Sequence, residues 1–88
     1  MTEGELIQAL NISGEMAIEV KRARDMYPKF NSAHEGYAVL REEVDELWDE
    51  IKKKTHDPVK LREEAIQVGA MSIRFIMDIV DGQNASQK

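Results

Sequence analysis

Six carboxylates lie within one eleven-residue stretch, REEVDELWDEI, at residues 41–51. Glu43 and Glu46 are three residues apart, and Glu64 and Gln67 repeat this spacing further along the chain. In a helix, residues three apart lie on one face. Carboxylate oxygens suit Mg²⁺, which takes a few of them and binds substrate phosphates through its remaining positions. Two such pairs can build a magnesium site if the fold brings them together.

A short loop centred near Thr55 is expected to bring the two pairs to the same level. Short loops join antiparallel neighbouring helices. In such a hairpin Glu46 lies opposite Glu64, and Glu43 lies opposite Gln67. The sequence therefore predicts three carboxylates and one amide beside a single helical seam. The alternative is a helical interaction module whose acids form a solvated face, since charged residues commonly flank an apolar seam.

Three helices must position these residues, because no stretch shows the alternation of a strand. Each begins at a residue that favours an N-cap: Thr2, Ser32 and Asp57. Pro28 ends the first helix, since the residue before a proline avoids the helical region. Gly82 is the expected end of the third helix. A single helical domain is therefore predicted at residues 1–81, with a flexible C-terminal tail at residues 82–88.

Apolar residues on the second and third helices follow helical spacing. The second helix carries a stripe of Tyr37, Leu40, Val44, Leu47 and Ile51, with Trp48 beside it. The third carries a face of Leu61, Ala65, Val68, Ser72, Phe75, Ile76 and Ile79, with apolar residues around most of the remainder. A chain this short needs another subunit to cover such a helix. The predicted fold is all-α: a helical hairpin plus an N-terminal helix, completing a four-helix bundle by oligomerisation.

Composition narrows the class of protein. The 88 residues carry a net charge of −5, which argues against binding a nucleic-acid polymer. There is no cysteine, so neither disulfides nor a thiolate metal site is available. No apolar run approaches a membrane span, and the acidic N-terminus lacks the basic start of a secretory signal. A cytoplasmic protein with no membrane partner is expected.

The acidic residues also carry a family resemblance. Glu42-Glu43-x-x-Glu46, 17 intervening residues and then Glu64-x-x-Gln67 resemble the EExxE and ExxD signature of the MazG-type all-α nucleoside triphosphate pyrophosphohydrolases. The stretches FNSAHEGYAVLREEVDELWDEIKKK and REEAIQVGAMSIRFIMDI are similar to a small single-domain branch of that family. The resemblance covers about residues 15–81.

This resemblance implies an activity and a cofactor. Members of the family use Mg²⁺, or Mn²⁺ in its place, to cleave (deoxy)nucleoside triphosphates between the α- and β-phosphates. The products are a nucleoside monophosphate and pyrophosphate, and many members are house-cleaning enzymes. They assemble as homo-oligomers, dimers or tetramers, in which paired subunits complete four-helix bundles.

Carried over residue by residue, Glu43 and Glu46 match the first pair of metal ligands, and Glu64 matches the start of the second. The family aspartate falls on Gln67, whose carbonyl oxygen can meet a metal but brings no charge. Glu46 is the first candidate for the general base, with Glu43 close behind it, and Glu42 is a candidate to support the ligands. A nucleotide-binding or regulatory relative with weak or no catalysis is the alternative that Gln67 leaves open.

Five further residues have two interpretations each. Trp48 can stack on a base or pack in the core or a subunit interface. His34 can contact a phosphate at a helix start or simply lie at the surface, and Lys29 can steer a triphosphate or serve solubility. Arg74 and Asp78 can supply a phosphate clamp and an acidic contact, or form an ordinary i, i+4 pair.

Overall fold

The computed structural model describes residues 1–82, all of whose regular structure is helical. The elements are α1 (Glu3–Met26), α2 (Ala33–Ile51), α3 (Pro58–Phe75) and the π-helix η1 (Ile76–Asp81). The predicted all-α class is confirmed. Of the predicted tail, Gly82 is the C-cap of η1, and residues 83–88 lie outside the described residues.

The three predicted N-caps all form. The Thr2 side chain accepts a hydrogen bond from the Glu5 backbone N–H, and the Glu5 carboxylate accepts one from the Thr2 backbone N–H. Together these two bonds form a capping box. Ser32 accepts from the Glu35 backbone, and Asp57 accepts from the first turn of α3. Such caps satisfy backbone N–H groups that have no partner inside a helix. These local contacts fix where each helix begins.

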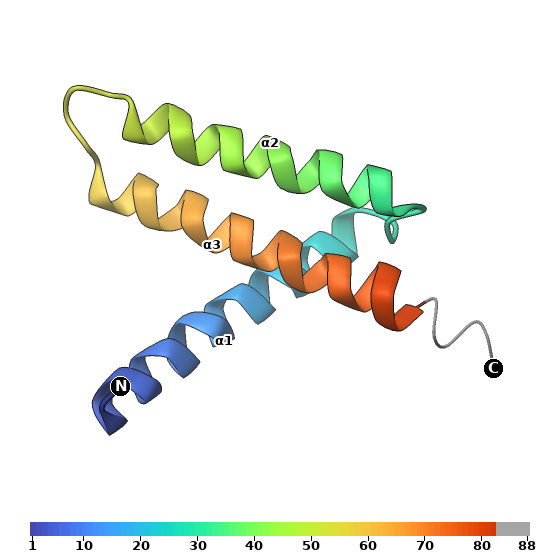
Figure 1. Ribbon diagram of the computed structural model, residues 1–88, viewed down its shortest axis with the longest axis horizontal. Helices are drawn as coiled ribbons and strands as arrows, with labels where there is room; N and C mark the ends of the chain where they lie inside the picture. The colour runs from blue at the N-terminus through green and yellow to red at the C-terminus, as the bar shows by residue number, and fades with distance from the viewer. Residues whose placement is uncertain (83–88) are drawn as a thin grey trace.

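Helices α2 and α3 form an antiparallel hairpin, and α1 crosses α3 obliquely, with its N-terminal half extending away from the hairpin (Figure 1). The buried core joins α1, the connector after it, α3 and η1, and comprises Val20, Ala23, Phe30, Ala70, Met71 and Ile79. The start of α2 comes close to this core at Gly36. A Cβ there would lie 2.7 Å from the Phe75 ring, so only glycine allows this approach.

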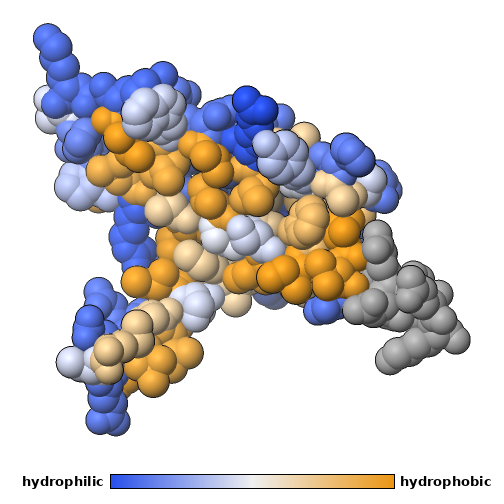
Figure 2. Space-filling view, viewed as in Figure 1, coloured by the Kyte–Doolittle hydropathy of each residue, from blue (hydrophilic) through white to orange (hydrophobic). Residues whose placement is uncertain are grey.

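Much of the predicted apolar surface is not covered within the single chain (Figure 2). On α2 the exposed members are Tyr37, Val44, Trp48 and Ile51. On the predicted face of α3, Ile79 is buried, whereas Ala65 and Ile76 are exposed. The chain buries Ala70, Met71 and Arg74 instead, because α3 must contact α1 as well as α2.

A polar clamp fixes the connector between α1 and α2. The carboxylate of Asp78, in η1, accepts from both terminal nitrogens of Arg24 and from the backbone N–H of Phe30. The Arg74 guanidinium lies 4.2 Å from the centre of the Phe30 ring and donates to the Pro28 carbonyl oxygen. The bond from Arg24 holds the pKa of Asp78 below its usual value. Three separate segments are thereby joined at one end of the molecule.

Candidate metal centre

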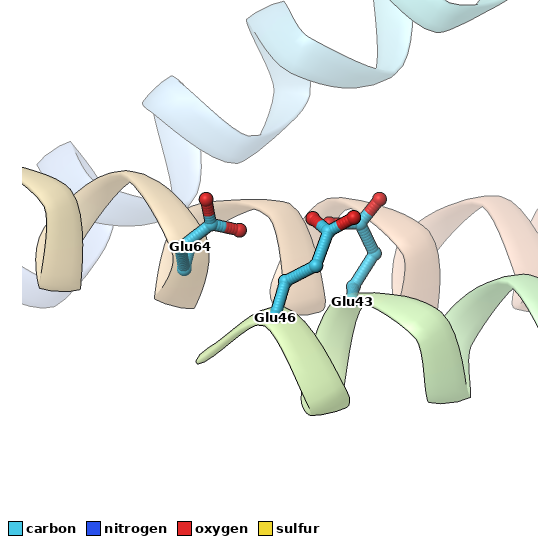
Figure 3. A group of neighbouring side chains, drawn as sticks. All are labelled: Glu43, Glu46 and Glu64. Atoms are coloured by element: carbon cyan, nitrogen blue, oxygen red, sulfur yellow. The ribbon is translucent and has the colours of Figure 1, made fainter. Parts of the chain in front are cut away.

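The structure brings Glu43, Glu46 and Glu64 together. Each offers a carboxylate oxygen, and these oxygens all lie within 4.8 Å of one another. Glu43 and Glu46 come from successive turns of α2, and Glu64 comes from the facing turn of α3 (Figure 3). This is the convergence that the spacing predicts for an antiparallel hairpin.

The donor set fits a small divalent cation. Mg²⁺ binds oxygens at about 2.1 Å, so opposite ligands lie about 4.2 Å apart. The three carboxylate oxygens lie within 4.8 Å of one another, which is close to the largest separation between two ligands of one such ion. In addition, Oε2 of Glu64 is buried without a hydrogen-bond partner among the described residues. A buried polar atom left unpaired costs free energy, and a cation would relieve that cost.

Electrostatics within the cluster also favour a cation. Burial, followed by repulsion from Glu46 and Glu64, raises the pKa of Glu43 to about 7. Burial and the charge of Glu46 likewise raise the pKa of Glu64. Both shifts mean that the folded protein resists holding several negative charges here. A divalent cation removes this penalty by compensating the charges directly.

The raised pKa of Glu43 predicts an unusual pH dependence. Its folded pKa of about 7 exceeds the ordinary value of 4.5, so between these values the folded state binds more protons than the unfolded state. The free energy of unfolding of the metal-free protein should therefore fall as pH rises from about 5 to 8. Urea denaturation across this range measures the effect.

Two comparisons isolate the contribution of Glu43 to that profile. Glu43→Gln should flatten the profile relative to the unmodified protein, since the amide does not titrate. Added Mg²⁺ should restore stability at pH 8 but not at pH 5, because protons compete with the cation for the same oxygens. A profile that is identical with and without Glu43 would contradict this account.

Gln67, the fourth predicted ligand, contacts a residue that the sequence did not single out. Its side-chain nitrogen Nε2 donates to Oε2 of Glu19 on α1 at 2.8 Å. Glu19 also accepts from Arg22 through its other oxygen at 2.7 Å. No sequence signal marked Glu19, because its position depends on how α1 crosses the hairpin.

A pocket with a cavity volume of about 500 Å³ opens beside the acidic cluster. Glu43 and Gln67 form part of its wall, and Glu19 forms another part. Its apolar lining includes Met26, Tyr27, Phe30, Val39 and Met71. The pocket therefore combines charged and amide groups with apolar and aromatic surface.

Arg74 is the one predicted substrate-binding residue that lines this pocket. It is only 4% exposed, and its Nε has no partner among the described groups. Asp78 is paired with Arg24 rather than with Arg74, so the ordinary i, i+4 pair is not what these two residues form. Glu42, the predicted supporting residue, also lines the pocket.

The other predicted substrate-binding residues lie outside the pocket lining. Lys29 is exposed within the connector between α1 and α2, and His34 is exposed in the first turn of α2. Trp48 is 54% exposed on the outer side of α2, with the Lys52 ammonium 6.0 Å from its ring. The single chain therefore does not place these three side chains in the pocket lining.

Comparisons with models of protein families, with curated proteins and with solved structures find no match for this chain. In the part of the chain that the structure describes, no helix is both long and apolar enough to cross a membrane. Support for a function therefore comes from the geometry of the acidic cluster and its pocket, together with the resemblance carried by the acidic motif.

Proposed function

We propose that this protein is a Mg²⁺-dependent nucleoside triphosphate pyrophosphohydrolase of the MazG type. The observation that carries the proposal is the convergence of Glu43, Glu46 and Glu64, from two helices, within 4.8 Å. Phosphoryl chemistry needs charge neutralisation on the phosphates and a positioned water. The cluster offers the oxygen ligands for the first requirement and a proton acceptor for the second.

The reaction follows from these groups. Glu43, Glu46 and Glu64 would hold Mg²⁺, which would supply charge neutralisation on the phosphate oxygens and a lowered pKa of a bound water. Water attacks the α-phosphorus, the bond to the bridging oxygen of the β-phosphate breaks, and pyrophosphate leaves with the bonding electrons. Glu46 and Glu43 are the two candidates to accept the proton of the water.

The pocket beside the cluster is the proposed place for the nucleoside. Its volume of about 500 Å³ is within the usual range for small-molecule sites, about 300–1,000 Å³. Tyr27 and Phe30 provide aromatic surface for a base, and Glu43 and Gln67 connect the pocket to the proposed metal site. A triphosphate that spans both places its α-phosphate beside the carboxylates.

A homo-oligomer is part of the proposal. The exposed residues Val44, Trp48 and Ile51 follow one another along α2 at helical spacing, and Ile76, Met77 and Val80 are exposed at the end of the hairpin. Exposed apolar surface of this kind marks interaction sites. A dimer or tetramer with completed four-helix bundles would cover it, and a cytoplasmic house-cleaning role belongs to the same proposal.

Pyrophosphate release from a panel of ribo- and deoxyribonucleoside triphosphates tests the activity. We expect release with Mg²⁺ and none with a chelator, with the preferred base identified by the panel. Equal release in both conditions would contradict a metal-dependent enzyme. The runner-up is a nucleotide-binding protein with weak catalysis, favoured by the neutral Gln67 amide at the position of the family aspartate. It predicts Mg²⁺-dependent nucleotide binding without release.

A further inference from the structure

We infer that α1 pairs with the α1 of a second copy of this chain, in antiparallel orientation, through a face that is exposed in the single chain. This face, the α1 seam, comprises Leu6, Ile7, Leu10, Gly14, Ala17 and Ile18. Apolar side chains gather on the half of α1 that extends away from the hairpin (Figure 2). The α1 seam is separate from the exposed residues of α2 and η1, and the inference does not depend on the proposed activity.

The α1 seam is the second apolar side of its helix. Val20 and Ala23 are buried in the core and Met16 packs against it, so these residues define the side that contacts α3. At about 3.6 residues per turn, Leu10 in the middle of the seam points away from that side, and it is 60% exposed. A helix with apolar residues on two sides packs against two partners. The hairpin of the same chain covers only the first side.

The α1 seam has the spacing by which two helices pair along their length. Its central members follow alternating steps of three and four residues: Ile7, Leu10, Gly14 and Ala17. A two-fold axis beside Ile12 sets Leu10 of each copy against Gly14 of the other. The same axis sets Ile7 against Ala17. Each large side chain then meets a small one, so the two helices interdigitate at close approach.

Gly14 has no packing role within the single chain. A Cβ at this position would meet no atom within 4 Å, so no neighbouring side chain requires a glycine here. In the interior of a helix, glycine is less favourable than alanine. The antiparallel pair gives this glycine a role, because it receives the Leu10 side chain of the second copy.

The charges at the two ends of the α1 seam favour a second, antiparallel copy as the partner. Glu3 precedes Ile7 by four residues and Lys21 follows Ala17 by four, so both continue the line of the seam. About the same two-fold axis, Glu3 of each copy lies opposite Lys21 of the other. The Lys21 side chain is 82% exposed and free to reach across. A parallel pair would instead bring like charges together at both ends, which is unfavourable.

A cavity of about 460 Å³ between α1 and α3 lies beside the seam. Its apolar lining consists of Ile18, at the edge of the seam, with Val59 and Ile66 of α3. Leu6 of the second copy lies opposite Ile18 in the antiparallel register. It would therefore cover this apolar lining, including Val59, which is 65% exposed in the single chain.

Analytical ultracentrifugation over a concentration series tests the interface. Leu10→Glu places two carboxylates near the two-fold axis, and we expect it to weaken self-association by at least about thirtyfold, as for a central hot-spot residue. Gln8→Glu is the control, because Gln8 is exposed on the other side of the same helix. It should leave association unchanged, and both variants should keep their helicity by circular dichroism. A monomeric unmodified protein, or equal association of Leu10→Glu and the unmodified protein, would overturn the inference.

Disulfide formation tests the orientation, since the chain has no cysteine of its own. Ile7→Cys and Ala17→Cys proteins are mixed in a thiol redox buffer, and we expect the mixed disulfide to form. Ile7→Cys alone should not form a dimer, because in the antiparallel pair its two cysteines lie about 15 Å apart along the helices, beyond the reach of a disulfide. A disulfide between two Ile7→Cys chains in place of the mixed one would overturn the antiparallel register. Both measurements are made without nucleotide or metal, so their results are independent of the proposed activity.

Discussion

Glu43→Gln and Glu64→Gln should each abolish pyrophosphate release while making the metal-free protein more stable at pH 8. Each change removes an oxygen ligand and a charge, so we expect turnover to fall by at least about a hundredfold. The raised pKa of both carboxyl groups shows that their ionised forms oppose folding. Replacing either with a neutral amide of the same shape therefore relieves repulsion.

The opposite directions of these two effects make the measurement informative. Activity is followed as Mg²⁺-dependent pyrophosphate release, and stability by thermal melting in chelator. Asp45→Asn is the matched control, because Asp45 is an exposed acid on the same helix and lies outside the cluster. It should leave both quantities unchanged. Full activity in either glutamine variant, or loss of the helical fold in both, would count against the metal centre.

Asp78→Ala should lower the free energy of unfolding by about 3 kcal/mol, because removing one member of a buried charged pair leaves the charge of the other uncompensated. The Asp78 side chain is 1% exposed and holds both Arg24 and the Phe30 backbone. This loss is large compared with the total free energy of unfolding of such a domain, which is about 5–15 kcal/mol. Urea denaturation at pH 7 measures it.

Asp25→Ala is the control for that experiment. Asp25 pairs with Lys21 at 3.8 Å, but both side chains are largely exposed. Surface pairs of this kind contribute at most about 1 kcal/mol. A similar loss of stability in both variants would show that the clamp at Asp78 has no special role. The contrast between them separates burial from the mere presence of an ion pair.

Sequence patterns were sufficient for the features that depend on one helix or on one short loop. The N-caps at Thr2, Ser32 and Asp57 depend on hydrogen bonds within a few residues. The meeting of Glu46 with Glu64 depends only on helical spacing and on the position of the loop. Both follow from local geometry, which the order of residues determines almost directly.

Features that depend on how α1 crosses the hairpin could not be predicted in this way. The contact between Glu19 and Gln67 joins residues 48 positions apart, and no periodic pattern relates them. Arg74 and Asp78 have the spacing of an α-helical pair, but the chain changes to a π-helix at Ile76. The wider turn, with hydrogen bonds from i to i+5, alters the direction of Asp78, which meets Arg24 instead.

The unbroken course of α1 has a mechanical consequence. The helix runs from Glu3 to Met26, so its exposed end at Leu6 and Leu10 belongs to the same rod as Glu19. At 1.5 Å per residue, Leu6 lies about 20 Å from Glu19 along that rod. A partner that binds the free end would therefore act on the whole helix, which would pivot at its crossing with α3. A tilt of α1 at this crossing would move the Glu19 carboxylate directly, without a relay through other side chains.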